Sequence, residues 1–289
     1  MTLTVGADPE FVYRRSNGSV VPCLGLIPGT KERPFDLGDG YTCHEDNVMV
    51  ELQIPPCESS VEFGAAIIEG KRRICDQFFD GRDEALVSSD SLYIGDPRSS
   101  NYSPQVFNFG CDPDYDAYQA GAMRTTLPKE LTGGPSRYAG GHIHIGGPLR
   151  CPPFVAALFA DLYLSLLPMV YDYMPLDRIG TMRTRWYGLP GIFRPKPYGL
   201  EYRTPSNWWT AGQSTAEMMG QQAFTLLYFL TNHTAVELKK TFTAIDWKYV
   251  QDFLRKAPPG MQLDPAALKN HRAELNALYK HCQNAGAFE

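Results

Sequence analysis

Polar and apolar residues alternate in several short stretches of this chain. The stretches lie at about residues 3–13, 47–54, 105–110, 140–146 and 199–203, and each predicts a β-strand, because successive side chains of a strand point to opposite faces. Apolar residues recur with a helical period at about residues 60–80, 153–172, 213–240 and 264–284. We therefore expect a protein of both strands and helices.

The order of these elements favours an α+β fold. Strands and helices are mixed without strict alternation, and long connections rich in glycine and proline join several strands. A doubly wound parallel sheet needs a helical crossover between successive strands. We therefore predict a curved, largely antiparallel sheet with helices packed on one side.

One segment suggests a boundary near the end of the chain. Ala257-Pro258-Pro259-Gly260 precedes the last helical stretch, and proline and glycine disfavour both helix and strand. We predict a main domain at residues 1–256 and a C-terminal helical extension at residues 257–289, packed on the same domain.

Polar residues stand two positions apart within four of the predicted strands. The pairs are Asp8 and Glu10, Glu51 and Gln53, His142 and His144, and Glu201 and Arg203. Side chains at i and i+2 of a strand share a face. If the four strands belong to one sheet, several carboxylates gather on one surface and repel one another unless a cation is present. A divalent metal ion is the counter-charge that we expect.

The densest of these segments is Gly140–Gly147, which reads Gly-Gly-His-Ile-His-Ile-Gly-Gly. Its glycines would allow other groups to approach the two imidazoles closely. Oxygen ligands with one or two imidazoles favour Mg²⁺ or Mn²⁺ over a closed thiolate zinc site. Taken singly, each acid could instead belong to a turn, an edge strand or a salt bridge, and each histidine could be a core residue.

Basic residues gather between positions 178 and 203, although the chain has a net charge of -5. The segment contains one acid, Glu201, and the basic residues Arg178, Arg183, Arg185, Arg194, Lys196 and Arg203. Guanidinium groups pair well with phosphate oxygens, although a solvated basic loop is the alternative. The chain has no P-loop and no Gly-x-Gly-x-x-Gly turn. A bound nucleotide would therefore be held by arginines and by metal ions on carboxylates.

Composition narrows the class of partner and the compartment. The net charge argues against general nucleic-acid binding and against anionic membranes. Seven cysteines without a Cys-x-x-Cys pair fit a reduced cytosolic protein, and the N-terminus has no signal-peptide pattern. The apolar stretch 154–171 contains Asp161 and Ser165, which favours a buried helix over a membrane span. We expect a soluble, cytoplasmic protein, and an oligomer is compatible with the sequence.

Taken in order, the motifs resemble a known family. They are Gly-Ala-Asp-Pro-Glu-Phe at 6–11, His44-Glu45-Asp46-Asn47 followed by Glu51, Gly-Cys-Asp-Pro-Asp at 110–114, Gly-Gly-His-Ile-His-Ile-Gly at 140–146, and Tyr187-Gly188 leading through Phe193-Arg194 to Gly-Leu-Glu-Tyr-Arg at 199–203. They resemble the carboxylate-amine ligases (amidoligases) of the phage-associated type, whose catalytic domain is similar to those of glutamine synthetase and glutamate-cysteine ligase. The resemblance runs from about residue 3 to residue 210.

The resemblance implies a glutamine synthetase-like catalytic domain that uses ATP and Mg²⁺ to join a carboxylate to an amine, in the host cytoplasm if the protein is phage-encoded. Its implied metal ligands are Glu10, Glu51, His142 and Glu201, its nucleotide contacts His144, Arg194 and Arg203, and its catalytic residues Glu51, Arg203 and Arg185. Some relatives have a second acid near Glu51 where this chain has Gln53, which leaves the number of metal ions open.

The expected reaction is attack of a substrate carboxylate on the γ-phosphate of ATP, which releases ADP and leaves an acyl phosphate for an amine to attack. Two alternatives stay open. A metal-dependent hydrolase could use His-x-His and nearby acids without ATP, and a nucleotide-binding protein could retain a degenerate ligase site. The substrates would be small-molecule or peptide carboxylates and amines, and the sequence does not name them.

Overall fold

The computed structural model describes residues 2–79, 86–88, 92–93, 114–119, 123–125, 136–171, 188–256 and 265–288. Several sequence predictions lie outside these residues: the strand at 105–110, the catalytic assignment of Arg185 with its neighbours Arg178 and Arg183, and the boundary segment 257–260.

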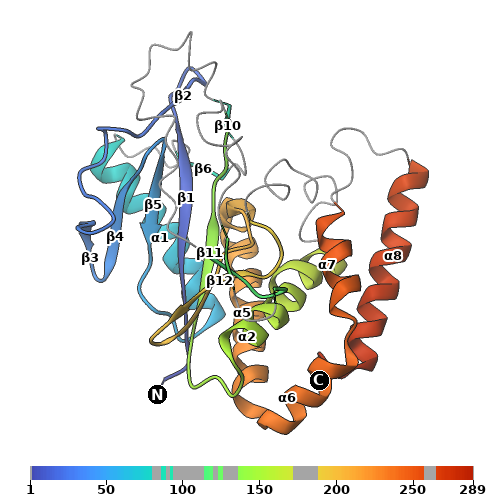
Figure 1. Cartoon of the computed structure of the whole chain (residues 1–289). Helices are drawn as coiled ribbons and strands as arrows, with labels where there is room; N and C mark the ends of the chain where they lie inside the picture. The colour runs from blue at the N-terminus through green and yellow to red at the C-terminus, as the bar shows by residue number, and fades with distance from the viewer. Residues whose placement is uncertain are drawn as a thin grey trace.

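A large antiparallel sheet forms one half of the protein (Figure 1). Its strands lie in the order β3-β4-β5-β1-β11-β13-β12-β8-β9, while β2 and β6 also pair with β1. These strands are β1 (Thr4–Arg14), β2 (Val20–Val21), β3 (Phe35–Gly38), β4 (Tyr41–Asp46), β5 (Met49–Gln53), β6 (Leu86–Val87), β8 (Asp114–Asp116), β9 (Met123–Thr125), β11 (Gly141–Gly146), β12 (Ile192–Lys196) and β13 (Gly199–Tyr202). A separate pair joins β7 (Leu92–Tyr93) to β10 (Ser136–Arg137). The predicted α+β fold with an antiparallel sheet is confirmed.

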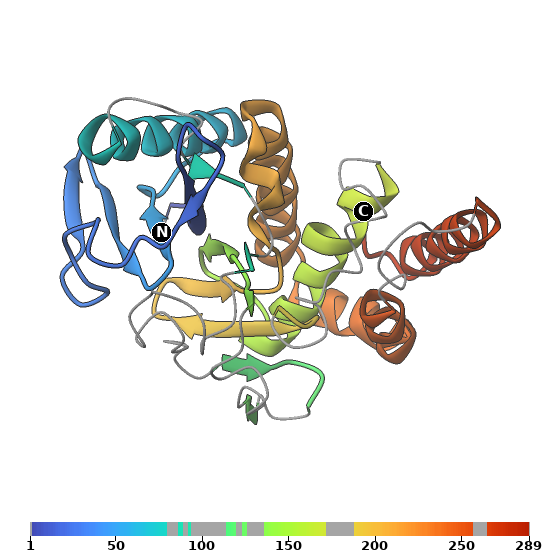
Figure 2. The ribbon, with the colours of Figure 1, turned by 90° about the horizontal axis from the view of Figure 1, so that it is seen from above.

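Helices cover one face of this sheet, and the sheet bends away from them (Figure 2). The helical segments are α1 (Ser60–Phe78), α2 (Pro153–Ala160), α3 (Leu167–Val170), α5 (Gln213–Asn232), α6 (Ala235–Ala244), α7 (Trp247–Arg255) and α8 (Pro265–Asn284). A π-helical segment at Asp161–Leu166 joins α2 to α3, and a 3₁₀ turn at Asn207–Ala211 precedes α5. Among the described residues, the opposite, concave face carries polar side chains that line a pocket.

Strand β1 shows how alternation sorts residues between the two faces. Val5, Ala7 and Phe11 are buried in the hydrophobic core beneath the helices. Asp8 and Glu10 point to the concave face, where they line a pocket. The pairing of β1 with both β5 and β11 places these two carboxylates in the middle of the sheet.

The apolar stretch near residue 160 is a core helix. Pro153–Val170 is long and apolar enough to cross a membrane, but 78% of this window is buried inside the protein. Burial of this kind is typical of the central helix of a soluble domain. It agrees with the prediction from Asp161 and Ser165.

Two details of the predicted elements were wrong. The single helix expected at 213–240 is two helices, because Thr234 begins α6 with a capping box in which its hydroxyl accepts from the Glu237 N–H and the Glu237 carboxylate accepts from the Thr234 N–H. The sequence analysis also missed helix α7 and nine of the described strands, which are β2, β3, β4, β6, β7, β8, β9, β10 and β12. Strand β12 contains Pro195, a residue that disfavours strand assignment.

The C-terminal helix packs on the rest of the protein. Leu275, Leu278 and Cys282 of α8 are fully buried. The Tyr163 hydroxyl, in the π-helical segment, donates to the backbone carbonyl of Ala287. The extension is therefore joined to the core by both apolar contacts and a buried hydrogen bond, while its exact boundary stays a prediction.

Candidate active site

Strand register brings the polar pairs together on the concave face. Asp8 lies opposite His142, and His144 lies opposite Glu201, across the β1-β11-β13 pairs. On the other side of β1, Glu10 lies opposite Glu51. These strands line a pocket of about 720 Å³. Residues more than a hundred positions apart in the chain thus share one surface.

Three acids at one end of the pocket form a first group that could hold a metal ion. Oxygen atoms of Glu10, Asp46 and Glu51 lie within 4.8 Å of one another. Burial raises the pKa of Glu51 well above its usual value, and the charges of Asp8, Glu10 and Asp46 raise it further. Such mutual repulsion is what a bound divalent cation would relieve.

Gln53 supports this group from the same strand. Its side-chain amide donates to Glu51 Oε1 over 3.3 Å, and its carbonyl accepts from the Thr42 hydroxyl. A carboxylate at position 53 would instead repel Glu51. The structure therefore accounts for glutamine at this position as an orienting partner of Glu51.

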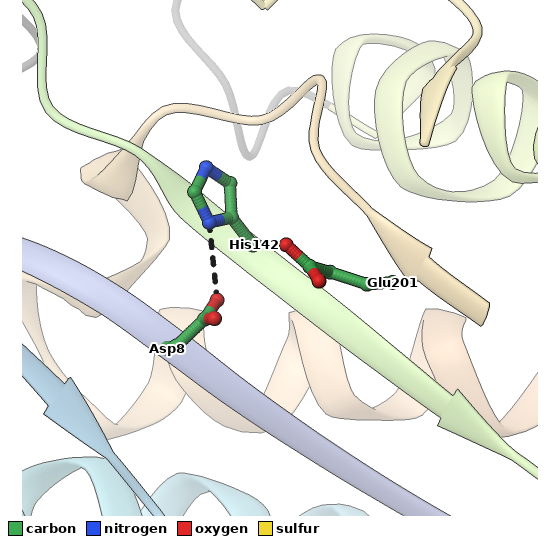
Figure 3. A group of neighbouring side chains, drawn as sticks. All are labelled: Asp8, His142 and Glu201. Atoms are coloured by element: carbon green, nitrogen blue, oxygen red, sulfur yellow. Dashed lines mark ion pairs between the residues drawn. The ribbon is translucent and has the colours of Figure 1, made fainter. Parts of the chain in front are cut away.

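A second group consists of Asp8, His142 and Glu201, drawn in Figure 3 from three neighbouring strands. Asp8 Oδ1 lies 3.1 Å from His142 Nδ1, and Asp8 Oδ2 lies 3.2 Å from His144 Nε2. Burial alone would raise the pKa of Asp8, but the two imidazoles hold it well below its usual value. Asp8 is therefore ionised and orients both histidines.

The other ring nitrogen of His142, Nε2, lies on the side of the ring away from Asp8 (Figure 3). Burial and the nearby Arg203 lower the pKa of His142, so the ring is neutral. Its Nε2 is buried and has no hydrogen-bond partner among the described residues. A side chain at Gly140 would place its Cβ 2.4 Å from this nitrogen and 3.1 Å from Glu10 Oε1. The neutral imidazole edge and the carboxylates fit a Mg²⁺ or Mn²⁺ ion.

Two arginines and two acids form a closed charge ring beside the second group. Asp114 Oδ1 lies 2.9 Å from Arg203 Nε and 3.0 Å from Arg194 Nη2. Glu201 Oε1 accepts from Arg203 and lies 3.4 Å from Arg194 Nη1. We call Asp114, Arg194, Glu201 and Arg203 the arginine ring.

The ring and its neighbours control the charge of Glu201. Burial and Asp8 raise the pKa of Glu201, but the positive charges around it, that of Arg203 foremost, outweigh them, and the pKa is lowered to about 2. Lys196 Nζ adds an ion pair with Glu201 Oε2 at 2.6 Å. Glu201 is thus ionised and already compensated by cations, whereas the first acid group contains Glu51 with a raised pKa.

His144 lies nearer the pocket mouth. Its Nδ1 is 2.6 Å from the Tyr198 hydroxyl, and the two rings stack with centroids 5.9 Å apart. Asp8 raises the pKa of His144 despite the opposing effect of burial. The His144 side chain is 22% exposed, so it can contact a ligand in the pocket.

The structure brings most of the predicted site residues together. Glu10, Glu51, His142 and Glu201 share one face, although in two adjoining groups, and Arg194 and Arg203 lie beside the second. Arg185 lies outside the described residues. The sequence analysis did not assign site roles to Asp8, Asp46 or Asp114. Each stood in one of the quoted motifs, but only strand pairing revealed its partners.

A comparison with protein-family models finds a match. A family model described as Phage phiEco32-like COOH.NH2 ligase-type 2 matches residues 131–285, more than half of the chain. The chain belongs to this family. The resemblance inferred from the motifs is therefore confirmed as to family.

The matched range differs from the range of the motifs. It includes β11, β12 and β13 with their histidines, Glu201 and both arginines of the ring, and it continues through α8. The C-terminal helices, which the motifs did not reach, are thus part of the family match. Residues 3–130 of the motif resemblance lie outside it. The chain has no match among curated proteins.

Proposed function

We propose that this family member is an ATP- and Mg²⁺-dependent carboxylate-amine ligase that forms an amide or peptide-like bond through an acyl phosphate and releases ADP. The observation that carries the proposal is one pocket lined by the carboxylates of two groups suited to metal ions and by the cations of Arg194, Lys196 and Arg203. Phosphoryl transfer needs both charge neutralisation and positioning of the phosphates.

The metal-binding role falls to Glu10, Asp46 and Glu51 in one group and to Asp8, His142 and Glu201 in the other. A Mg²⁺ ion bound there would neutralise charge on phosphate oxygens during transfer. A metal ion at this group would offset the charges that raise the pKa of Glu51, since a nearby cation favours its ionised form.

The basic residues would bind and orient the nucleotide phosphates. Arg203, Arg194 and Lys196 present their cations along β12 and β13, next to His144. An oxygen of the substrate carboxylate then forms a bond to the γ-phosphorus as the bond to the ADP oxygen breaks. The amine nitrogen next attacks the acyl carbon, the C–O bond to phosphate breaks, and the amine loses a proton.

The basic set favours a ligase over a metal-dependent hydrolase. A hydrolase needs only a metal-activated water and no phosphate contacts. Here Arg203 is 6% exposed yet lines the pocket, and its charge is balanced by Asp114 and Glu201. Burying that many charges is costly, and binding of phosphates would give these cations a role that a hydrolase does not need. Gln53 orients Glu51, so it gives no support to a degenerate site.

The substrates in this proposal are small-molecule or peptide carboxylates and amines, and the protein acts in the cytoplasm without nucleic-acid or membrane partners. To test it, the protein is incubated with ATP, Mg²⁺ and a mixture of free amino acids, and ADP and condensed products are followed by mass spectrometry. ADP release that depends on the amine supports a ligase. Product without ATP would indicate a hydrolase, and ATP binding without turnover a degenerate site.

The Glu51→Ala variant tests whether the first acid group is needed for turnover. It removes a ligand from the first acid group, so turnover should be abolished while the fold is retained. Glu58→Ala changes an exposed glutamate outside the pocket and should leave turnover unchanged. An active Glu51 variant with unaltered metal dependence would refute the assignment.

A further inference from the structure

A buried carboxylate lies behind the site, on the helix side of the sheet. Asp161 begins the π-helical segment between α2 and α3 and is 0% exposed. It contributes nothing to the pocket lining. A charge-bearing group in this position is costly to bury and calls for an explanation.

Three donors among the described residues point at Asp161. The Tyr118 hydroxyl donates to Oδ2 over 2.7 Å, the Gly191 backbone N–H donates to Oδ1 over 2.9 Å, and the Tyr202 hydroxyl also donates to Oδ1. The Ser165 and Tyr202 hydroxyls lie 2.9 Å apart. Burial raises the pKa of Asp161 to about 7, although the three donors oppose this rise.

These donors belong to the three elements that carry the arginine ring. Tyr118 follows β8, which bears Asp114. Gly191 immediately precedes β12, which bears Arg194. Tyr202 ends β13, between Glu201 and Arg203, and points to the opposite face from both.

The packing around these donors leaves little room for adjustment. Gly191 has a φ of +76°, and a Cβ there would lie 2.7 Å from the Tyr118 ring. Its carbonyl accepts from the Ala117 N–H over 3.0 Å. On the other side, the Arg203 N–H donates to the Ile192 carbonyl over 2.9 Å. Displacing the Asp161 contacts would therefore shift the strand ends on which the ring is built.

We propose that Asp161 is a positioning residue that aligns β8, β12 and β13 from behind and so sets the geometry of the arginine ring for phosphate binding. The phosphate-binding part rests on the proposed function; the alignment does not. The strand ladder alone holds β8 weakly, because β8 pairs with β12 at only two described positions, Ile192 with Asp116 and Phe193 with Tyr115. A single carboxylate that is hydrogen-bonded to all three elements can fix their relative positions more tightly.

The experiment compares Asp161→Asn with Tyr163→Phe. The asparagine keeps the shape of the side chain but removes one acceptor oxygen. Tyr163→Phe, two residues further in the same segment, removes a buried hydroxyl that donates a hydrogen bond to the Ala287 carbonyl rather than to the arginine ring. Both variants lose a buried hydrogen bond, so the second controls for a simple loss of stability. Binding of a non-hydrolysable ATP analogue and of Mn²⁺, and hydrogen exchange by mass spectrometry, are measured where both variants are folded.

Asp161→Asn should weaken binding of the ATP analogue by about tenfold while Mn²⁺ binding to the first acid group is unchanged. Its hydrogen exchange should rise in peptides from 114–119, 188–196 and 199–204 but not in β1 or β5. Tyr163→Phe should show neither effect. If Asp161→Asn binds the ATP analogue as tightly as the wild type and its hydrogen exchange is unchanged, the proposed alignment is wrong. A rise in hydrogen exchange that is the same in every strand of the sheet would also contradict it. If the wild type itself binds no ATP analogue, the proposed function fails, and the exchange pattern alone decides whether Asp161 aligns the strands.

Discussion

Glu51 lies among buried acids, and its environment sets a testable pH dependence. Its pKa in the folded protein is raised by burial and by three like charges, so its contribution to stability is present below the unfolded value and is lost as the pH rises. Metal binding requires the ionised form. The stabilisation given by Mg²⁺ should therefore grow as the pH rises from about 5 to about 8.

Thermal unfolding with and without MgCl₂ across this pH range measures the effect. Glu51→Gln, which cannot ionise, should lower the Mg²⁺-dependent increase in Tm and flatten its pH dependence. An increase in Tm that is the same at every pH for the wild type would contradict a metal site that includes Glu51.

Asp114 supports both arginines of the ring through one oxygen. Asp114→Asn replaces a charged acceptor with a neutral one, so Arg194 and Arg203 should lose their alignment, and ATP affinity should fall by about tenfold. Isothermal titration calorimetry with an ATP analogue measures this affinity. Asp252→Asn, which breaks an exposed pair with Lys248, is the matched control. Unchanged affinity in the Asp114 variant would remove the residue from the site.

Strand β11 shows how an element combines close packing with ligand placement. Ile143 and Ile145 are fully buried on the helix side, while His142 and His144 point to the concave face and His144 lines the pocket. Gly141, at its start, leaves no space for a side chain, because a Cβ would lie 2.4 Å from the Ser206 carbonyl oxygen. The glycines around the histidines are thus required by the close approach of neighbouring atoms.

Gly140→Ala tests this packing directly. The added Cβ would overlap His142 Nε2 and must displace the ring. We expect metal affinity to fall by about 10- to 100-fold, comparable to the loss of an orienting contact in a metal site. Mn²⁺ binding followed by electron paramagnetic resonance measures it. Gly212→Ala, where a Cβ would meet no atom within 4 Å, should bind Mn²⁺ normally; equal affinity in both variants would count against His142 as a ligand.

Elements with a clear pattern were predictable, and those without one were not. Strands β1, β5, β11 and β13 each present apolar residues to the core and polar ones to the pocket, so their alternation is visible in the sequence. Strand β12 bears Pro195, and the α5-α6 junction keeps an apolar helical period across the break at His233 and Thr234. At β12 tertiary packing overrode the local signal of Pro195, whereas the α5-α6 break follows a local signal, the capping box of Thr234 and Glu237, that the apolar period concealed.

The whole protein depends on its C-terminal helix for part of its core. Leu278 of α8 is fully buried, and α8 packs against α3 and α7. Leu278→Ala should lower the free energy of unfolding by about 2–5 kcal/mol through the cavity that it leaves. Urea denaturation measures this change. Val236→Ala, at a position 78% exposed on α6, should change it by less than about 0.5 kcal/mol. A small effect at Leu278 would mean that the extension contributes little to the domain.

The sequence by itself determined which residues share a face. The i, i+2 spacing of Asp8 and Glu10, and of His142 and His144, follows from the pleat of a single strand, a local property that alternation reveals. The family and its expected chemistry also came from motifs that lie within short segments.

Only the tertiary structure decided which faces meet. Asp8 contacts His142, 134 positions away, because β1 pairs with β11, and that pairing follows from burying both strands against the same helices. The division of the acids into two groups, the arginine ring around Asp114 and the three donors to Asp161 all depend on long-range register. No local pattern carries that information, because the energy that sets it comes from core packing across the whole sheet.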